Sequence, residues 1–202
     1  MFPSVTTLGV SPTINPQKRQ VHNMSGDPSN ARLWADADVY VSFDTEAANP
    51  ADVDTPFGGD WDLVGLLDGD DGFTESRDED VEDLFAWGGI LVRTARKNFK
   101  LTRTFTALED NETTFRLRWP GSTDDTIVTP SGARVERVRV AFETVDGDTV
   151  HRLISTYQAE ITVDGDINEN ESELSSIPFI VTVFPNDDGE LFTVQTADVT
   201  SS

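Results

Sequence analysis

The stretch Asp71–Trp119, DGFTESRDEDVEDLFAWGGILVRTARKNFKLTRTFTALEDNETTFRLRW, decides the fold. It joins an acidic segment, a Trp87-Gly88-Gly89 corner, a basic segment and an amphipathic run. The corner predicts a packed position, with the tryptophan in the core or at an interface. The stretch contains none of the glycine-rich, nucleophile or metal-ligand patterns of catalytic sites. It therefore predicts a function that resides in an assembled surface, and the chain is not expected to be an enzyme.

Local patterns predict the elements of this stretch. The sequence SRDE at 76–79 matches a capping box and predicts a short helix over 77–85, with an extended segment as the alternative. After the Trp-Gly-Gly corner, two strands are expected at 90–95 and 98–106, joined by a tight basic turn. Residues 107–118 are predicted to form a helix that ends at the following Pro-Gly.

Outside this stretch the pattern is that of β-structure. Alternation of apolar and polar residues predicts strands at 39–44, 61–67, 135–142, 150–157, 160–163, 177–184 and 191–196. Loops as long as the one expected at 45–60 are uncommon in compact domains unless they are functional or disordered. The sum is a mainly β fold, a β-sandwich or partial barrel with one short α-helix and long loop and arm extensions. We expect one domain over 36–202 behind an extended N-terminal arm over 1–35.

Composition bounds the class of protein. With 202 residues the chain is long enough for one well-buried core. It has no cysteine, which excludes disulfides and thiolate chemistry. The N-terminal segment lacks a basic region followed by an apolar run, so no secretory signal is expected. No stretch approaches the roughly 20 apolar residues that span a bilayer, so no membrane partner is expected.

The charge of the chain is large and unevenly distributed. A net charge of −22 argues against binding nucleic acid by neutralising phosphates, because that mode needs clustered Lys and Arg. Residues 36–85 hold 17 acids and one base, residues 93–139 ten bases and six acids, and residues 143–202 13 acids and one base. A basic middle between acidic flanks fits either oriented docking between subunits or pairing within one subunit. A generally acidic surface, as in a halophile, accounts for part of the charge.

A calcium or transition-metal site is not supported. Asp164, Asp166 and Asn168 have the 1-3-5 spacing of a calcium loop, but Glu169 stands where that loop needs glycine and Ser175 where it needs a bidentate acid. The two histidines lack ligand-spaced partners. Neither a metal nor a cofactor is expected.

Three motifs carry a resemblance to a known family. They are GFTES at Gly72–Ser76, AWGG at Ala86–Gly89 with Val92-Arg93 following, and FTALEDN at Phe105–Asn111 before Phe115-Arg-Leu. In order and spacing over roughly residues 60–120, they resemble the major tail tube proteins of long-tailed siphophages. The resemblance is weaker over the C-terminal strands and has no motif in the N-terminal arm.

The resemblance implies a β-sandwich subunit that closes into a hexameric ring. Stacked rings would form a hollow tube through which genome DNA is ejected without specific binding. It also implies other phage tail proteins at the tube ends, and a location in the virion tail after assembly in the host cytoplasm. Family members carry a long loop that reaches the adjacent ring, and residues 45–60 sit where that loop would fall.

Three sets of contact residues are expected on this basis. The inter-ring contact loop is represented by Asp52, Val53, Asp54, Pro56 and Phe57. The lumen candidates are Asp146, Asp148, Asp164 and Asp166, because a wall of carboxylates repels phosphates. The subunit-interface candidates are Trp87, Gly88, Gly89, Arg93, Arg137 and Arg139.

The alternative function comes from the four tryptophans, Trp34, Trp61, Trp87 and Trp119. Tryptophans grouped on one surface can form a sugar-binding platform, although such residues are more often core or interface anchors. The competing interpretation is therefore a carbohydrate- or receptor-binding β-sandwich module of a virion.

Overall fold

A computed structural model describes residues 27, 30–121, 135–167 and 169–198 of the chain. The chain divides into two units, Met1–Arg32 and Leu33–Ser202, and the strands and the helix found among the described residues belong to the second unit. The arm expected over 1–35 lies outside the described residues, apart from 27 and 30–35. Within the described part of the chain, no helix is long and apolar enough to cross a membrane.

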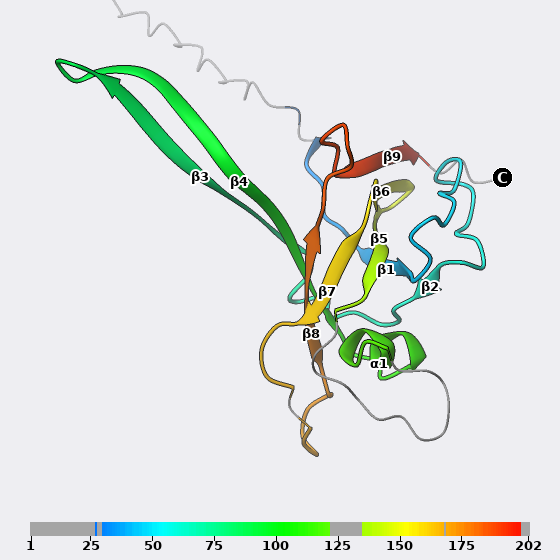
Figure 1. The fold of residues 1–202 in the computed structure, drawn as a ribbon. Coiled ribbons are helices and arrows are strands. Elements are labelled where there is room, and N and C mark those ends of the chain that lie inside the picture. The colour runs from blue at the N-terminus through cyan, green and yellow to red at the C-terminus, as the bar shows by residue number, and fades with distance from the viewer. Residues whose placement is uncertain (1–26, 28–29, 122–134, 168, 199–202) are drawn as a thin grey trace, which may run out of the picture. The chain divides into compact units, whose positions relative to one another are not determined.

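The described residues of the second unit form nine strands and one helix (Figure 1). In chain order these are β1 (Asp36–Ser42), β2 (Asp62–Leu63), β3 (Thr74–Ala86), β4 (Ile90–Ala107), α1 (Glu112–Arg118), β5 (Arg137–Asp146), β6 (Thr149–Ser155), β7 (Ala159–Val163), β8 (Ile177–Val183) and β9 (Phe192–Asp198). All strand pairs are antiparallel. The expected mainly β fold with one short helix is confirmed, and the sheet is not closed into a barrel.

Strand β5 connects two layers of sheet. Its first residues, Arg137 and Val138, pair with β7 in a sheet of order β5-β7-β8-β4-β3, which we call sheet B. The remainder of β5 pairs with β1 and β6 in a sheet of order β2-β1-β5-β6-β9, which we call sheet A. Because one strand serves both sheets, the inner faces of the two layers are held together by the backbone itself.

The hydrophobic core lies between these inner faces. Val39 on β1 and Phe142 on β5 are buried from sheet A, and Phe105 on β4 and Phe179 on β8 from sheet B. The rings of Phe105 and Phe179 have centroids 5.2 Å apart. Strand β8 pairs with β7 on one side and β4 on the other, so its nearly continuous apolar run lies in the interior of sheet B.

The helix predicted over 77–85 is wrong. These residues belong to β3, which pairs with β4 along its length in one long hairpin. The extended alternative was the right interpretation, because the acidic residues of this segment pair across the hairpin with the basic residues of β4, as Asp78 does with Lys100 and Asp80 with Lys97. The two strands predicted at 90–95 and 98–106 are likewise a single strand, β4, which carries an irregularity at Asn98 instead of a turn.

The helix predicted over 107–118 is shorter than expected. It begins at Glu112, because Asn111 caps it: the Asn111 side chain accepts a hydrogen bond from the Thr114 amide at 3.0 Å. In return the Asn111 amide donates to the Thr114 hydroxyl at 2.8 Å, which completes a capping box. The residues between β4 and the helix are therefore not helical. A hydrogen bond from the Leu108 amide to the carbonyl of Leu66 holds them against the segment that follows β2.

The strand predicted over 61–67 is reduced to Asp62–Leu63 by Gly65. Gly65 has φ +103°, in the region that L side chains rarely adopt, and a Cβ at this position would lie 2.5 Å from Oε2 of Glu109. The same carboxylate accepts a hydrogen bond from the Leu66 amide at 3.0 Å. Gly65 therefore lets the chain pass close beside the residues that precede α1.

Replacing this glycine should destabilise the fold. We expect Gly65→Ala to lower the free energy of unfolding by about 2 kcal/mol or more, because it adds backbone strain to a steric clash. Gly58→Ala is the matched control, since a Cβ there meets nothing within 4 Å. Urea denaturation of the two variants measures the difference, and equal stabilities would contradict the role given to Gly65.

Candidate assembly surfaces

The outer part of the β3–β4 hairpin pairs only with itself. Strand β4 contacts β8 from Leu101 onward, so residues 90–100 have β3 as their only strand partner among the described residues. Figure 1 shows the hairpin continuing beyond the rest of sheet B as a two-stranded ribbon. We call residues 78–100, which are distinct from the expected N-terminal arm, the arm, residues 84–92 its tip and the remainder its stem.

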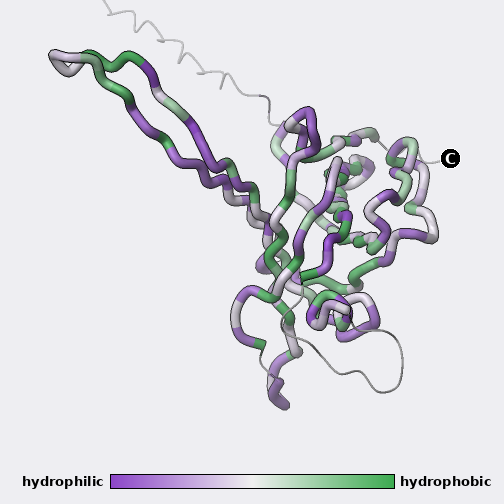
Figure 2. The backbone as a smooth tube through the Cα atoms, in the orientation of Figure 1, coloured by the Kyte–Doolittle hydropathy of each residue, from purple (hydrophilic) through white to green (hydrophobic). Residues whose placement is uncertain are grey.

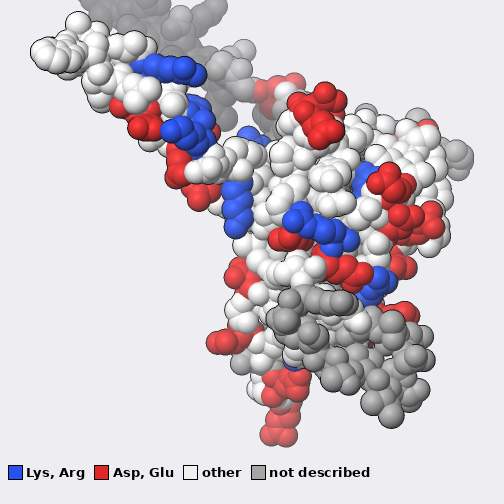
Figure 3. All heavy atoms as spheres, viewed as in Figure 1, with Lys and Arg blue, Asp and Glu red and all other residues white. Residues whose placement is uncertain are grey.

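Opposite charges face each other across the stem. In the register of the hairpin, Asp80 lies opposite Lys97 and Asp78 opposite Lys100. Ion pairs join Lys97 to Glu82 at 2.8 Å and Arg96 to Glu79. Figure 3 shows acidic and basic side chains alternating over this part of the surface. Exposed pairs of this kind contribute at most about 1 kcal/mol each, so they set register and cancel charge more than they stabilise.

A β-bulge lies in the stem at Asn98. Its φ of 56° is left-handed, a conformation that asparagine tolerates better than most residues. Its side-chain amide donates to Oδ2 of Asp80 at 2.7 Å, which holds the extra residue in place. The register shifts here between Asp78 and Asp80. Bulges of this kind increase the local twist of a ribbon and disrupt its free edge.

The tip of the arm is apolar and exposed. Trp87 is 100% exposed and Phe85 62%, and around them large side chains are exposed at Leu84, Ile90, Leu91 and Val92. Figure 2 shows mainly hydrophilic residues along the stem and hydrophobic ones next to the turn, and Figure 3 shows the tip free of charge. Contiguous apolar surface of this kind marks an interaction site, because it is unfavourable in water.

The two glycines make the turn at the tip. Gly88 and Gly89 have φ of 87° and 77°, and a Cβ at either would meet nothing within 4 Å. The predicted packed corner is therefore wrong within one subunit. Trp87 and the glycines lie at the end of a hairpin, and the glycines are needed for turn geometry and not for close approach.

The long loop at 45–60 covers the outer face of sheet A. Its apolar residues turn inward: Val53 is buried, and Phe57 stacks on Tyr40 of β1 with centroids 4.1 Å apart. Trp61, which ends the loop, is buried and donates its indole N–H to the Ala48 carbonyl at 3.0 Å. The loop is thus an added layer on the sheet, held by its own small core.

Two arginines beneath the loop hold its backbone. Arg139 on β5, 7% exposed, donates to the carbonyls of Ala47 at 2.6 Å and Ser155. Burial lowers the pKa of its guanidinium, and the charge of Glu46 opposes that effect. Arginine nevertheless keeps its proton in proteins, so a charged group stands under the loop.

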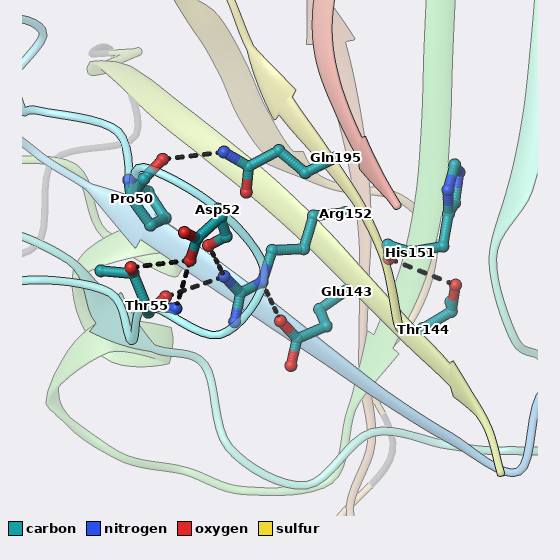
Figure 4. A network of polar contacts seen from close by, with 8 residues as sticks. All are labelled: Pro50, Asp52, Thr55, Glu143, Thr144, His151, Arg152 and Gln195. Carbon is teal, nitrogen blue, oxygen red and sulfur yellow. Dashed lines mark hydrogen bonds and ion pairs between the residues drawn. The ribbon is translucent and has the colours of Figure 1, made fainter. Parts of the chain in front are cut away.

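Arg152 on β6 makes the larger set of contacts (Figure 4). Its guanidinium donates to the carbonyls of Asp52 and Thr55, both at 2.9 Å, and to the carboxylate of Glu143. It also lies 4.9 Å from the ring centroid of Phe57. Hydrogen bonds from Thr55, with its hydroxyl first, lower the pKa of Asp52 and so favour the carboxylate. One side chain therefore connects β5, β6 and the loop.

The structure separates the predicted site residues. Of the inter-ring set, Asp52, Asp54 and Pro56 face solvent, whereas Val53 and Phe57 pack on their own subunit. The lumen candidates fall in two places: Asp146 and Asp148 lie at the turn between β5 and β6, and Asp164 and Asp166 follow β7.

The interface candidates are also divided. Trp87, Gly88, Gly89 and Arg93 lie on the arm, with Arg93 opposite Leu84. Arg137 is half exposed and pairs with Glu160 of the same chain at 2.9 Å, and Arg139 is buried. The guanidinium of Arg139 is thus already bound to backbone carbonyls of its own subunit.

Sequence reasoning missed the apolar residues on either side of the tip glycines. The signal was present as LFAWGGILV at 84–92, an apolar run centred on a turn and flanked by opposite charges. It also missed Arg152, for which the sequence offers no local signal.

Among the described residues, this fold and its surfaces define a class: a β-sandwich subunit with a group of exposed apolar residues at the tip of an arm whose charges are paired within the subunit. Comparison with known proteins gives the family. Residues 24–202 match the family model of the phage tail tube protein, and the chain belongs to that family. No curated protein matches the chain. Its role is accordingly structural, in the tail of a virion, and the family points to a protein that is not an enzyme.

Proposed function

We propose that the chain closes into hexameric rings, and that these rings stack into the hollow tube through which a long-tailed siphophage ejects its genome DNA. The observation that carries this proposal is the arm, with an apolar tip on a stem whose charges are already paired within the subunit. An arm of this kind gains most when its tip is buried on another copy. The family supports the same conclusion, because a tube is made of repeated subunits.

A head-to-tail contact explains why a ring and then a tube would form. When one surface of a subunit binds a different surface of the next, the rotation either closes a ring or propagates a filament. The strands at the edges of the two sheets, β3, β9 and β2, present backbone groups that a neighbour can pair. Assembly would remove these edges and bury the apolar tip in one step.

The finer contacts are part of the proposal. Trp87, Gly88, Gly89, Arg93 and Arg137 are proposed at subunit interfaces. The solvent-facing residues of the 45–60 loop, Asp52, Asp54 and Pro56, are proposed at contacts between rings. Asp146, Asp148, Asp164 and Asp166 are proposed on the lumen.

The partners follow from the same proposal. Other copies of the chain make the tube, other tail proteins close its ends, and assembly takes place in the host cytoplasm. DNA passes without specific binding, which suits a chain of net charge −22. The carbohydrate- or receptor-binding alternative is not favoured by the family, and the four tryptophans are distributed over separate elements, with Trp61 buried under the loop.

Negative-stain electron microscopy of the purified chain over a range of concentrations tests this proposal. The expected result is rings and hollow tubes with six-fold cross-sections. Discrete monomers at every concentration, combined with measurable glycan affinity, would overturn it in favour of the receptor-binding module.

A further inference from the structure

Sheet B covers the inner face of sheet A only in part. One row of side chains crosses that face on β1, β5, β6 and β9, through Val39, Phe142, Leu153 and Val194. Val39 and Phe142 are buried and Leu153 is half-buried, but Val194 is 59% exposed. The cover that sheet B provides therefore ends before β9, which is an edge strand of sheet A.

An aromatic pair extends this exposed part of the face. His151 on β6 lies on the inner face, because the next residue, Arg152, reaches the loop on the outer face. The His151 ring stacks on Trp34 with centroids 6.0 Å apart, and its Nδ1 lies 2.8 Å from the Thr196 hydroxyl on β9. The Trp34 side chain is 43% exposed. We use the term uncovered end of sheet A for Trp34, His151, Leu153, Val194 and Thr196.

The uncovered end has no carboxylate, lysine or arginine among its residues. Burial lowers the pKa of His151, and the positive charge of Arg103 adds to that effect, so the imidazole is neutral near pH 7. In a chain of net charge −22, an uncharged surface of this kind is best matched by an uncharged partner. A charged partner would lose its hydration on contact and gain no counter-charge in return.

Arg103 on β4 marks the boundary between the covered and the uncovered part of the face. Its guanidinium lies 4.5 Å from the ring centroid of Phe142 and 5.5 Å from that of Phe73, and its ion pair with Glu75 is long, at 3.6 Å. The Nε of Arg103 is buried and has no hydrogen-bond partner in the described part of the chain. Packing at this boundary is thus incomplete in the free subunit.

The tip of the arm is the segment whose chemistry fits this surface. The tip is free of charge, and Phe85 and Trp87 expose their rings there. Other exposed apolar side chains, such as Tyr157 and Leu174, lie singly in loops. Because Trp87 is 100% exposed, the tip does not contact the uncovered end of its own chain, and only another copy can bring the two surfaces together.

From these observations we infer that the uncovered end of sheet A is the surface that receives the tip of the arm of a second copy of the chain. This inference rests on the proposed assembly and adds the receiving surface. In this position the two-stranded tip continues the layer of sheet B over the inner face of sheet A. The contact buries Val194 and Trp34 together with Phe85 and Trp87 of the other copy, and apolar burial drives it.

A charge on the receiving surface should block assembly. We expect Val194→Asp to raise the concentration needed for tube formation at least about tenfold, because the tip offers no group to pair with the carboxylate. The fold should remain intact, since Val194 is largely exposed in the free subunit. The matched control is Thr193→Asp, because Thr193 is also exposed but precedes Val194 on β9 and so lies on the outer face. Sedimentation measures assembly, and thermal unfolding checks the fold.

Disulfide cross-linking tests the contact directly, because the chain has no cysteine of its own. A double variant carries Ala86→Cys at the tip and Val194→Cys on β9. Its tubes are oxidised with copper phenanthroline and separated on a denaturing gel without reductant. We expect a ladder of linked chains, since each tip would be joined to β9 of the next copy. The control variant Ala86→Cys, Thr193→Cys should remain mainly monomeric.

The outcomes separate this inference from the proposed function. Normal tubes that give no ladder with Val194→Cys, or an equal ladder with Thr193→Cys, would overturn the inference and leave the tube intact. A disulfide closed within one chain would also overturn it. So would a block of assembly by Leu63→Asp on β2 and not by Val194→Asp, since the receiving surface would then lie at the opposite edge of sheet A. Failure of the unmodified chain to form any tube would instead defeat the proposed function.

Discussion

A chain that carries Phe85→Asp and Trp87→Asp should fold normally and form no tubes. Both rings are exposed in the free subunit, so removing them changes the free energy of unfolding by no more than about 0.5 kcal/mol. In an assembled interface, buried aromatic anchors are each worth about 2 kcal/mol or more. The double change should therefore raise the concentration needed for assembly at least about a thousandfold.

Sedimentation and electron microscopy measure that concentration, and thermal unfolding confirms that the fold is intact. Leu174→Asp is the control, since Leu174 is 78% exposed but lies in the loop between β7 and β8, away from the arm. It should assemble at the ordinary concentration. Tubes from the double variant at the same concentration as the unmodified chain would show that the tip has no part in assembly.

The second large effect is on stability, at Arg152. We expect Arg152→Met to lower the free energy of unfolding by about 3 to 5 kcal/mol, because it leaves the carboxylate of Glu143 unpaired in a largely buried site. It also leaves the Asp52 and Thr55 carbonyls without their donor. Urea denaturation should be done with the Phe85→Asp, Trp87→Asp change present, so that assembly does not contribute to the measured stability.

Two further variants make this result specific. Arg137→Met removes an ion pair whose arginine side chain is 44% exposed, and should cost less than about 1 kcal/mol. Adding Glu143→Gln to Arg152→Met should recover part of the lost stability, because the unpaired charge is removed. If Arg152→Met alone proved as stable as the unmodified chain, the loop would be held by its apolar contacts alone.

The elements that could be predicted from sequence are those decided by local alternation. The strands at β1 and β8 and the hairpin turn between β5 and β6 follow from apolar periodicity and an Asp-Gly signal. The helix expected at 77–85 failed because a local capping match was given more weight than the charges of β4, which pair with these residues across the hairpin. The start of α1 was misplaced because Asn111 and Thr114 form a capping box with residue types less typical of that motif.

The contacts of the 45–60 loop could not be predicted, for a physical reason. Arg139 and Arg152 reach carbonyls that are 92 and 100 residues away in the chain. Those carbonyls belong to the backbone, so no side-chain pattern identifies them. Val53 and Phe57, which the sequence analysis placed at a contact between rings, are apolar and pack within the subunit, Phe57 against the outer face of sheet A.

The arm has a consequence for when polymerisation starts. A two-stranded ribbon without a third strand is only marginally stable in water, so the outer arm of an isolated subunit opens and closes readily. Capturing it carries an entropic penalty that falls mostly on the first contacts of a new filament. An existing template that already presents a binding surface for the tip lowers this nucleation barrier. Free subunits would then remain unassembled until such a template is present, and a filament would grow from it.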